Sequence, residues 1–258
     1  MRGMKNKKLK AILSITGYFL LVIALCVSAT IVFHNVYYES VYISGSSMAP
    51  TLQGSTMTPS GYGFDIEKEG STVDFGIVDT HQSAIDHIKR FSIISTYYHT
   101  DYNSNGVLIN GSNEKIKRVI VMPNETFKIE NSKLYIKNEK GFESVPYTFN
   151  IDPAVEDGYP GKDIGETTLG DDEYWVLGDH RDKSHDCGSS DMNRPIKKSY
   201  ISGVLVAIEG KAKIKIKECQ CPNCGTTYSK GVICGKCGST LNQKFELVDR
   251  EYHWPIYY

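Results

Sequence analysis

One apolar segment near the N-terminus limits how this chain can fold. Residues 11–33, AILSITGYFLLVIALCVSATIVF, carry no charge, and residues 1–10 before them are rich in Lys and Arg and contain no acid. As a helix this segment would be about 34 Å long, because each residue adds about 1.5 Å, whereas the hydrocarbon core of a bilayer is about 30 Å thick. The segment therefore predicts a membrane-spanning helix, and its basic flank predicts a cytoplasmic N-terminus.

A cleaved signal peptide is the alternative for this segment. Its apolar core would be shorter, about 7–15 residues, and a small-x-small cleavage site would follow it. Val-Ser-Ala at 27–29 offers such a site, but the apolar run continues past it to Phe33, which favours an anchor that is not cleaved. The most apolar later segment, ISGVLVAI at 201–208, is far too short to span. We therefore predict a single-pass protein of the cell membrane whose chain beyond the anchor is extracytoplasmic.

Beyond the anchor the chain shows almost no helical periodicity. Residues 115–122, KIKRVIVM, predict a strand that ends at Pro123, and residues 127–137 alternate about Asn131 and Ser132 as a hairpin does. The part beyond the anchor is therefore predicted to be mainly β.

The formal net charge is −1, so the chain has no excess of basic residues with which to neutralise phosphates, and we expect no nucleic-acid partner.

A serine-rich stretch, SGSSMAPTL at 44–52, raises the question of a nucleophile. A serine hydroxyl is a poor nucleophile unless a base removes its proton, and His with Asp, a neutral Lys or a metal are the partners to consider. Lys117 would share a strand face with Val119 and Val121, while Arg118 would point to the opposite face. This pattern predicts a buried Lys117 and an exposed Arg118, although taken alone it also fits an ordinary half-exposed strand. Lowering the lysine pKa from about 10.4 to about 7 would cost about 4.6 kcal/mol, which burial can supply.

Three motifs, in order along the chain, resemble those of the type I signal peptidase (leader peptidase) family. They are SGSSMAPTL at 44–52, KRVIVMPNE at 117–125 and GDHRDKSHD at 178–186. The resemblance covers roughly residues 5–210. It implies a mainly β fold with a large antiparallel sheet domain, a smaller inserted β region at about 124–172 and an N-terminal anchor. It also implies removal of signal peptides from exported preproteins, with small residues preferred one and three positions before the cut.

Within these motifs the resemblance assigns roles to individual residues. Ser47, directly before Met-Ala-Pro-Thr-Leu, would be the nucleophile, and Lys117 would be the general base. The backbone N–H of Ser47, with Gly45 nearby, would bind the oxyanion, and Ser184 would orient the lysine amine. This chemistry requires no cofactor. Further positions that match the motifs are Met48, Pro50, Arg118, Gly178, Asp179, Arg181, Asp182 and Asp186.

The third motif departs from the family pattern. His180 stands where the family usually has Asn, and Cys-Gly at 187–188 replaces the usual Ser-Arg. Asp186 would then either lack its usual arginine partner or recruit Arg194. These changes leave two alternatives open. His180 could be the general base, or the domain could be a degenerate peptidase that acts as an anchored, zinc-ribbon protein-binding module.

Five of the seven cysteines lie within residues 219–237. The spacing Cys-x2-Cys-x9-Cys-x2-Cys predicts a closed, tetrahedral, zinc-ribbon-like site for a structural zinc ion. Two disulfides are the alternative, because the segment is predicted to lie outside the cytoplasm. Cys219 would be a spare thiol or an exchangeable ligand. The predicted zinc ligands are Cys221, Cys224, Cys234 and Cys237.

The tyrosines of residues 37–107 and the final HWPIYY would either lie at the lipid interface or pack within a sheet. The expected partners are preproteins, membrane lipid and the secretion machinery. The predicted parts are a basic cytoplasmic segment (1–10), an anchor (11–36), a catalytic domain (37–217), a zinc-ribbon-like segment (218–241) and a C-terminal tail (242–258).

Overall fold

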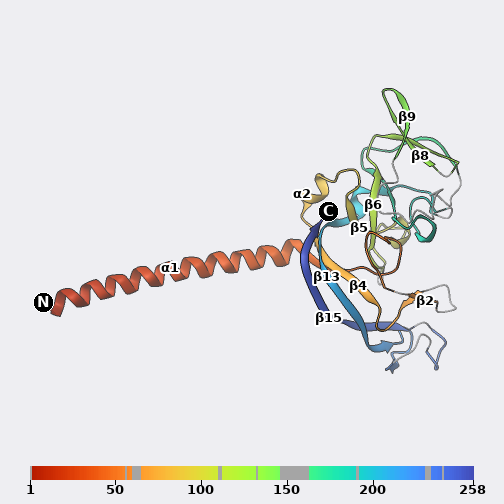
Figure 1. The fold of residues 1–258 in the computed structure, drawn as a ribbon. Helices are drawn as coiled ribbons and strands as arrows, with labels where there is room; N and C mark the ends of the chain where they lie inside the picture. The colour runs from red at the N-terminus through yellow and green to blue at the C-terminus, as the bar shows by residue number, and fades with distance from the viewer. Residues whose placement is uncertain are drawn as a thin grey trace. The chain divides into compact units, whose positions relative to one another are not determined.

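The chain forms two units, Met1–Glu39 and Ser40–Tyr258. The first unit contains the helix α1 (Arg2–Tyr37), which is the helix expected from the apolar run (Figure 1). Among the described residues, α1 is the one helix long and apolar enough to cross a membrane, and its stretch Ser14–Phe33 has a mean hydropathy of 2.4. The computed structural model describes residues 2–55, 57–59, 65–109, 112–131, 133–145, 163–189, 192–229, 234–239 and 241–258.

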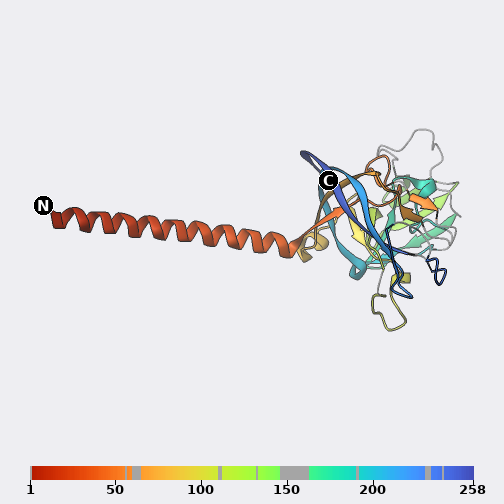
Figure 2. The ribbon, with the colours of Figure 1, turned by 90° about the horizontal axis from the view of Figure 1, so that it is seen from below.

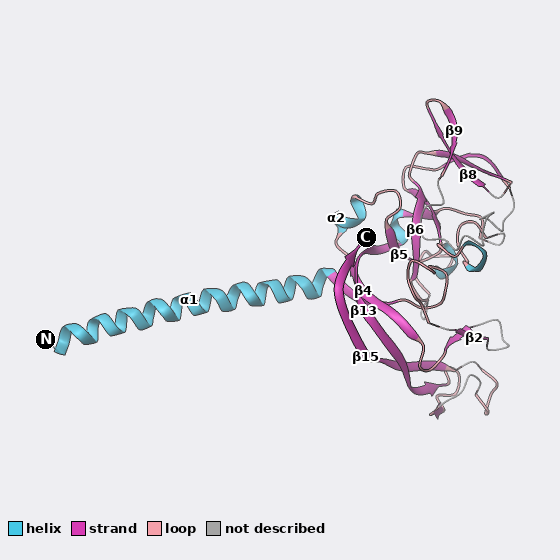
Figure 3. Ribbon diagram, in the orientation of Figure 1, coloured by secondary structure: helices cyan, strands magenta, loops and turns pink. Residues whose placement is uncertain are grey.

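The second unit is built mainly from strands, as the sequence predicts (Figure 3). Its largest sheet has nine strands, in the order β1-β4-β13-β5-β6-β11-β12, and β14 and β15 also pair with β13. The pairings of β13 with β4, β5 and β15 are antiparallel. The strands are β1 (Tyr38–Tyr42), β4 (Thr72–Asp79), β5 (Ile93–Thr96), β6 (Lys115–Val121), β11 (Glu173–Leu177), β12 (Ile196–Lys197), β13 (Ile201–Gln220), β14 (Thr227–Tyr228) and β15 (Asn242–Tyr257).

Two smaller sheets belong to the same unit. One has four strands in the order β10-β7-β8-β9, and the other pairs β2 with β3. The β7–β8 hairpin is the one expected from the alternation about Asn131, whose φ is 50°. The predicted domain boundaries stay a prediction. The remaining elements are β2 (Met57–Pro59), β3 (Asp65–Glu67), β7 (Thr126–Glu130), β8 (Lys133–Asn138), β9 (Gly141–Ser144), β10 (Ile164–Thr168), α2 (Gln82–Asp86), η1 (His99–Asp101), η2 (Arg181–Lys183) and η3 (Lys198–Tyr200).

Two clusters of buried apolar side chains hold the second unit together. One joins β6 and β11 to the four-stranded sheet, where the rings of Phe127 and Trp175 have centroids 4.8 Å apart. The other contains Met48 and Leu52, which are 1% and 0% exposed. Burying a side chain of this size stabilises a fold by about 1.5–3 kcal/mol. The second cluster therefore fixes the serine-rich stretch to the large sheet.

The long strand β13 organises the C-terminal part of the chain. It pairs with β5 at Ile201–Val204 and then with β15 from Ala207 to Gln220. The strands β4, β13 and β15 run side by side along a curled sheet (Figures 1 and 2). The cysteine-rich segment lies between the two strands of the β13–β15 hairpin, and the segment predicted as a C-terminal tail contains a strand of 16 residues.

Candidate active site

The serine-rich stretch forms a loop after β1, and Asp74 of β4 holds both ends of it. The Asp74 carbonyl accepts a hydrogen bond from the Ile43 N–H at 2.9 Å. Its backbone N–H donates to the Gln53 carbonyl at 2.8 Å, and its carboxylate accepts from the Gln53 N–H at 2.6 Å. Within the loop the φ of Gly45 is 70°, and a Cβ on Gly54 would lie 1.5 Å from the Gly45 carbonyl oxygen. Both positions therefore require glycine.

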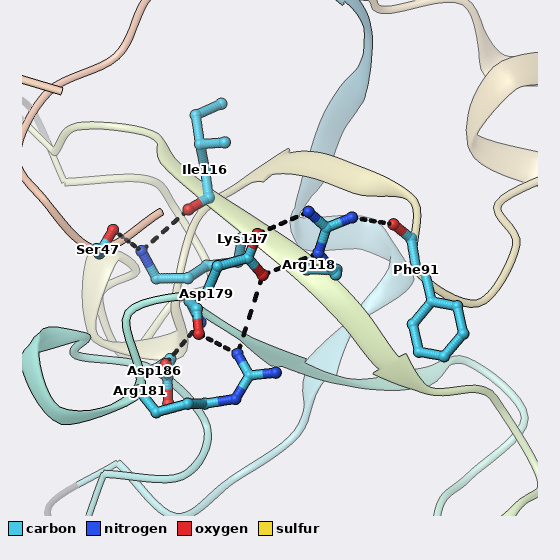
Figure 4. A network of polar contacts seen from close by, with 9 residues as sticks. Ser47, Phe91, Ile116, Lys117, Arg118, Asp179, Arg181 and Asp186 are labelled. Atoms are coloured by element: carbon cyan, nitrogen blue, oxygen red, sulfur yellow. Dashed lines mark hydrogen bonds and ion pairs between the residues drawn. The ribbon is translucent and has the colours of Figure 1, made fainter. Parts of the chain in front are cut away.

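Lys117 lies on β6 and reaches the serine loop (Figure 4). Its Nζ is 2.9 Å from Ser47 Oγ and 3.0 Å from the Ile116 carbonyl oxygen. The side chain is buried, as the sequence predicts, and only 4% of Lys117 is exposed. Burial lowers the pKa of Lys117 to about 8, against the opposing charge of Asp186, because a buried ammonium loses its hydration. The structure thus brings the predicted nucleophile and the predicted base together.

Arg118 is also buried, which corrects the expectation of an exposed arginine. It is 5% exposed, and its Nε and a terminal nitrogen donate to the two Asp179 carboxylate oxygens at 2.8 and 2.6 Å. The guanidinium also donates to the Phe91 carbonyl at 2.9 Å. Strand alternation correctly placed Arg118 on the face of β6 opposite to Lys117. That face is also covered, by Asp179 and Phe91. A bidentate carboxylate makes burial of the arginine tolerable.

The third motif lies against the serine loop. A Cβ on Gly178 would lie 2.4 Å from the Ser47 carbonyl oxygen and 2.2 Å from Ser184 Oγ, so the close approach of the two loops requires glycine. The backbone N–H of His180 donates to the Ser47 carbonyl at 3.0 Å, and its Nδ1 lies 3.2 Å from the Ser46 carbonyl oxygen. His180 therefore contacts the backbone of the serine loop.

The carboxylate of Asp186 has backbone partners in place of the arginine that the family pattern would supply. Its carboxylate accepts hydrogen bonds from the backbone N–H groups of Gly178 and Gly188 at 2.8 and 2.9 Å. Arg194 is exposed. Backbone amides of the motif thus serve as partners of this carboxylate. The neighbouring thiol of Cys187 is fully buried, and burial raises its pKa to about 12.

The remaining motif residues have distinct positions. Arg181 is buried, donates to the Gly178 carbonyl and lies 3.9 Å from an Asp179 oxygen. Ser184 Oγ is buried and has no hydrogen-bond partner within the part of the chain that the structure describes. Its predicted bond to the lysine amine is not formed here, so the orienting role stays a prediction. The side chain of Asp182 lies outside the described residues.

Two structural partners of the site were not found by sequence reasoning. One is Asp74, whose hydrogen bonds to Ile43 and Gln53 hold both ends of the serine loop. The pairing of Arg118 with Asp179 joins two motifs 61 residues apart, and no local pattern reports it.

The family model described as "Signal peptidase, peptidase S26" matches residues 15–208 of this chain. The chain belongs to this family. The matched region contains the serine loop, β6 and the third motif. Residues 209–258, with the cysteine-rich segment and β15, lie beyond it.

Individual relatives match a shorter stretch of the chain than the family model does. Signal peptidase I of Bacillus amyloliquefaciens is 41% identical over 83 residues, which cover 31% of this chain and 44% of the relative. Signal peptidase I S of Bacillus subtilis (strain 168) is 36% identical over 84 residues, 31% of this chain and 45% of the relative. The chain thus spans less than half the length of these relatives. A crystal structure of a signal peptidase I from Enterococcus faecalis V583 is 22% identical, with a TM-score of 0.31, and the match covers 46% of this chain and 96% of that chain.

The four cysteines predicted to bind zinc come together at the tip of the β13–β15 hairpin. Their sulfur atoms all lie within 4.8 Å of one another. The distances are 3.4 Å for Cys221–Cys237, 3.5 Å for Cys224–Cys234 and 3.8 Å for Cys224–Cys237. A tetrahedron with metal–sulfur bonds of about 2.3 Å has edges of about 3.8 Å, whereas a disulfide is about 2.0 Å long. The cluster therefore fits a zinc ion.

Neighbouring hydrogen bonds favour thiolates in this cluster, whereas burial acts against them and raises the pKa of Cys221 to about 11. The Cys224 N–H donates to Cys221 Sγ at 3.4 Å. The hydroxyl of Tyr228 lies 3.3 Å from Cys234 Sγ, and this hydrogen bond is the main cause that lowers the pKa of Cys234. Metals bind the deprotonated sulfur, so both contacts favour the form that binds metal. Cys219 is buried in a small cluster that also contains Cys221, Cys234 and Leu241.

Proposed function

We propose that this chain is a membrane-anchored serine endopeptidase that removes signal peptides from exported preproteins. The observation that carries the proposal is the 2.9 Å contact between a buried lysine amine and the hydroxyl of Ser47. Membership in the signal peptidase family supports it. With a pKa of about 8, Lys117 is neutral at pH 7 in about one molecule in ten, against about one in three thousand at a pKa of 10.5.

The geometry suits a serine and lysine mechanism. The neutral amine of Lys117 takes the proton of Ser47 Oγ, which attacks the scissile carbonyl and forms a tetrahedral intermediate. The backbone N–H of Ser47 and the loop near Gly45 stabilise its oxyanion. The ammonium then protonates the leaving amine, and an acyl-enzyme remains on Ser47. Lys117 finally activates a water molecule that hydrolyses the ester.

The charges around the amine suit this proton cycle. Asp186 and Asp179 both raise the pKa of Lys117, but burial outweighs them. Both carboxylate oxygens of Asp179 accept hydrogen bonds from Arg118. The amine of Lys117 instead contacts a hydroxyl and a carbonyl oxygen. Lys117 can therefore lose its proton near neutral pH and regain it during the reaction.

The preprotein would bind as an added strand beside β6. β11 pairs with β6 from Val121 to Arg118, so the peptide would continue along the same edge at Lys117. It would lie between β6 and the serine loop. The helix α1 would anchor the chain with its N-terminus in the cytoplasm, and the site would face the other side, where the secretion machinery delivers preproteins. The cysteine cluster would hold a structural zinc ion in a ribbon.

Cleavage of a preprotein by the full chain in detergent tests the proposal. We expect cleavage by the wild type, a loss of at least about 1,000-fold in Ser47→Ala and Lys117→Ala, and activity within about tenfold in His180→Ala. Equal activity in all of these proteins would eliminate the proposed pair. Activity lost in His180→Ala but kept in Lys117→Ala would make the histidine the base. An inactive wild type would favour the protein-binding alternative.

A further inference from the structure

A lysine of β13 contacts two residues that hold the serine loop to β4. The Nζ of Lys211 lies 2.9 Å from Asp74 Oδ1 and 2.6 Å from Gln53 Oε1. Gln53 directly follows the stretch SGSSMAPTL, and its backbone N–H donates to the other carboxylate oxygen of Asp74 at 2.6 Å. These three residues therefore form a connected set of polar contacts at the end of the loop, which we call the Lys211 brace.

The large sheet fixes the partners of this brace. Lys211 of β13 pairs with Asp74 of β4 on one side and with Glu251 of β15 on the other (Figure 1). Residues directly opposite each other on antiparallel strands have Cβ atoms about 4.5–5.5 Å apart, so their side chains can interact. Asp74 is only 7% exposed. A buried carboxylate is costly unless its charge is paired, and Lys211 supplies that pairing.

We propose that Lys211 is a positioning residue for cleavage, because it fixes, through Asp74 and Gln53, the loop that presents Ser47. This inference rests on the proposed function. The family model matches residues 15–208, so Lys211 lies beyond the matched region, on the part of β13 that pairs with β15. The C-terminal part of the chain, which has no role in the proposed chemistry itself, thereby supports the candidate active site.

The carboxylate of Asp74 connects this amine to the loop. The backbone of Asp74 contacts Ile43 and Gln53 in any case, but the additional bond from the Gln53 N–H needs a carboxylate in this orientation. Lys211 holds that orientation through the second oxygen. Because 43% of the Lys211 side chain is exposed, the ion pair stabilises the fold little. Its loss should therefore change the placement of Ser47 more than the free energy of unfolding.

Cleavage kinetics of the full chain in detergent, with a preprotein as substrate, test this role. Lys211→Met removes the amine and keeps an aliphatic side chain, whereas Lys211→Arg keeps a cation. Lys213→Met is the matched control, because Lys213 is the next lysine of the same strand and its Nζ lies 3.1 Å from Asp249 Oδ2. Hydrogen exchange over residues 43–55, measured by mass spectrometry, reports the loop without any need for catalysis.

A nucleophile displaced by about 1 Å can cost about 100-fold in rate, and a loop still held by its backbone contacts should lose less. We expect kcat of Lys211→Met to fall about tenfold with KM within about twofold, as for an interaction that matters in the transition state. Lys211→Arg should restore about half or more of the rate, and Lys213→Met should leave it unchanged. In an Asp74→Asn background, Lys211→Met should cost about twofold or less, because its partner is already altered. Exchange over 43–55 should be faster in Lys211→Met than in Lys213→Met.

Equal kcat in Lys211→Met and Lys213→Met would overturn the inference and leave the proposed function standing. A loss that persists undiminished in the Asp74→Asn background would overturn it too, because the amine would then act independently of this carboxylate. So would faster exchange throughout the chain in Lys211→Met, since the loss would then come from general destabilisation. A wild type that cleaves no preprotein would instead refute the proposed function, and with it this inference.

Discussion

Replacing Lys117 with methionine should abolish cleavage and yet stabilise the fold. A pKa lowered from 10.5 to about 8 by burial corresponds to about 3 kcal/mol, since each unit is worth about 1.36 kcal/mol. The folded chain carries this cost whenever the unfolded lysine would be charged. Methionine fills a similar volume without a charge. We therefore expect Lys117→Met to raise the free energy of unfolding by up to about 3 kcal/mol at pH 7.

The pH dependence of this gain identifies its cause. Between pH 8 and 10.5 the unfolded lysine holds a proton that the folded lysine has lost, so the wild type gains stability as pH rises through this window. The advantage of Lys117→Met should thus be complete below pH 8 and vanish above pH 10.5.

Denaturant unfolding of the full chain in detergent, followed by the emission of buried Trp175, measures this difference. Ser47→Ala is the matched control, because it removes the hydroxyl that contacts the amine and keeps the buried charge. An advantage that is constant with pH would refute the reasoning. So would a Lys117→Met protein less stable than Ser47→Ala at pH 7.

Three further predictions follow from the same contacts. The acid limb of kcat/KM should lie near pH 8, with a roughly tenfold rise in initial cleavage rates from pH 7 to 9, and a limb near pH 6.5 would point to a histidine base. Asp179→Ala leaves the guanidinium of Arg118 buried without its carboxylate and should cost about 3–5 kcal/mol in denaturant unfolding, whereas adding Arg118→Met should restore part of that loss. Purified protein should contain zinc by elemental analysis, and Cys234→Ser should lose it and lower the melting temperature. Equal zinc content in both proteins would exclude this cluster as the site.

The sequence predicted which two side chains meet at the candidate site better than it predicted what surrounds them. Ser47 and Lys117 could be found because each stands in a short motif whose residue types suit one reaction. The burial of Lys117 followed from its apolar strand neighbours. The burial of Arg118 did not, because the two-residue period of a strand tells which face a side chain is on and not what covers that face. The cover comes from Asp179, far along the chain.

The C-terminal strand shows the same limit. Residues 242–258 read as a polar and aromatic tail because their alternation is irregular. The irregularity has a physical cause, since β15 pairs with β13 through three shifts of register and residues 249–254 are exposed. The partner strand β13 is regular, because Lys and apolar residues alternate at 211–217. Its pattern is therefore recognisable as a strand, whereas that of β15 is not. A strand with register shifts can therefore be recognised only once its partner is known.

The two faces of β6 give the proposed base, Lys117, and the neighbouring Arg118 different surroundings. Arg118 is held by a bidentate carboxylate, which compensates the charge of its guanidinium. Lys117 points to the other face, where its nearest partners are a hydroxyl and a carbonyl oxygen. Neither can compensate an ammonium as a carboxylate does, so burial is free to lower the lysine pKa. Moving the Asp179 carboxylate to the lysine face would stabilise the ammonium, and it would thereby remove the neutral amine that the reaction needs.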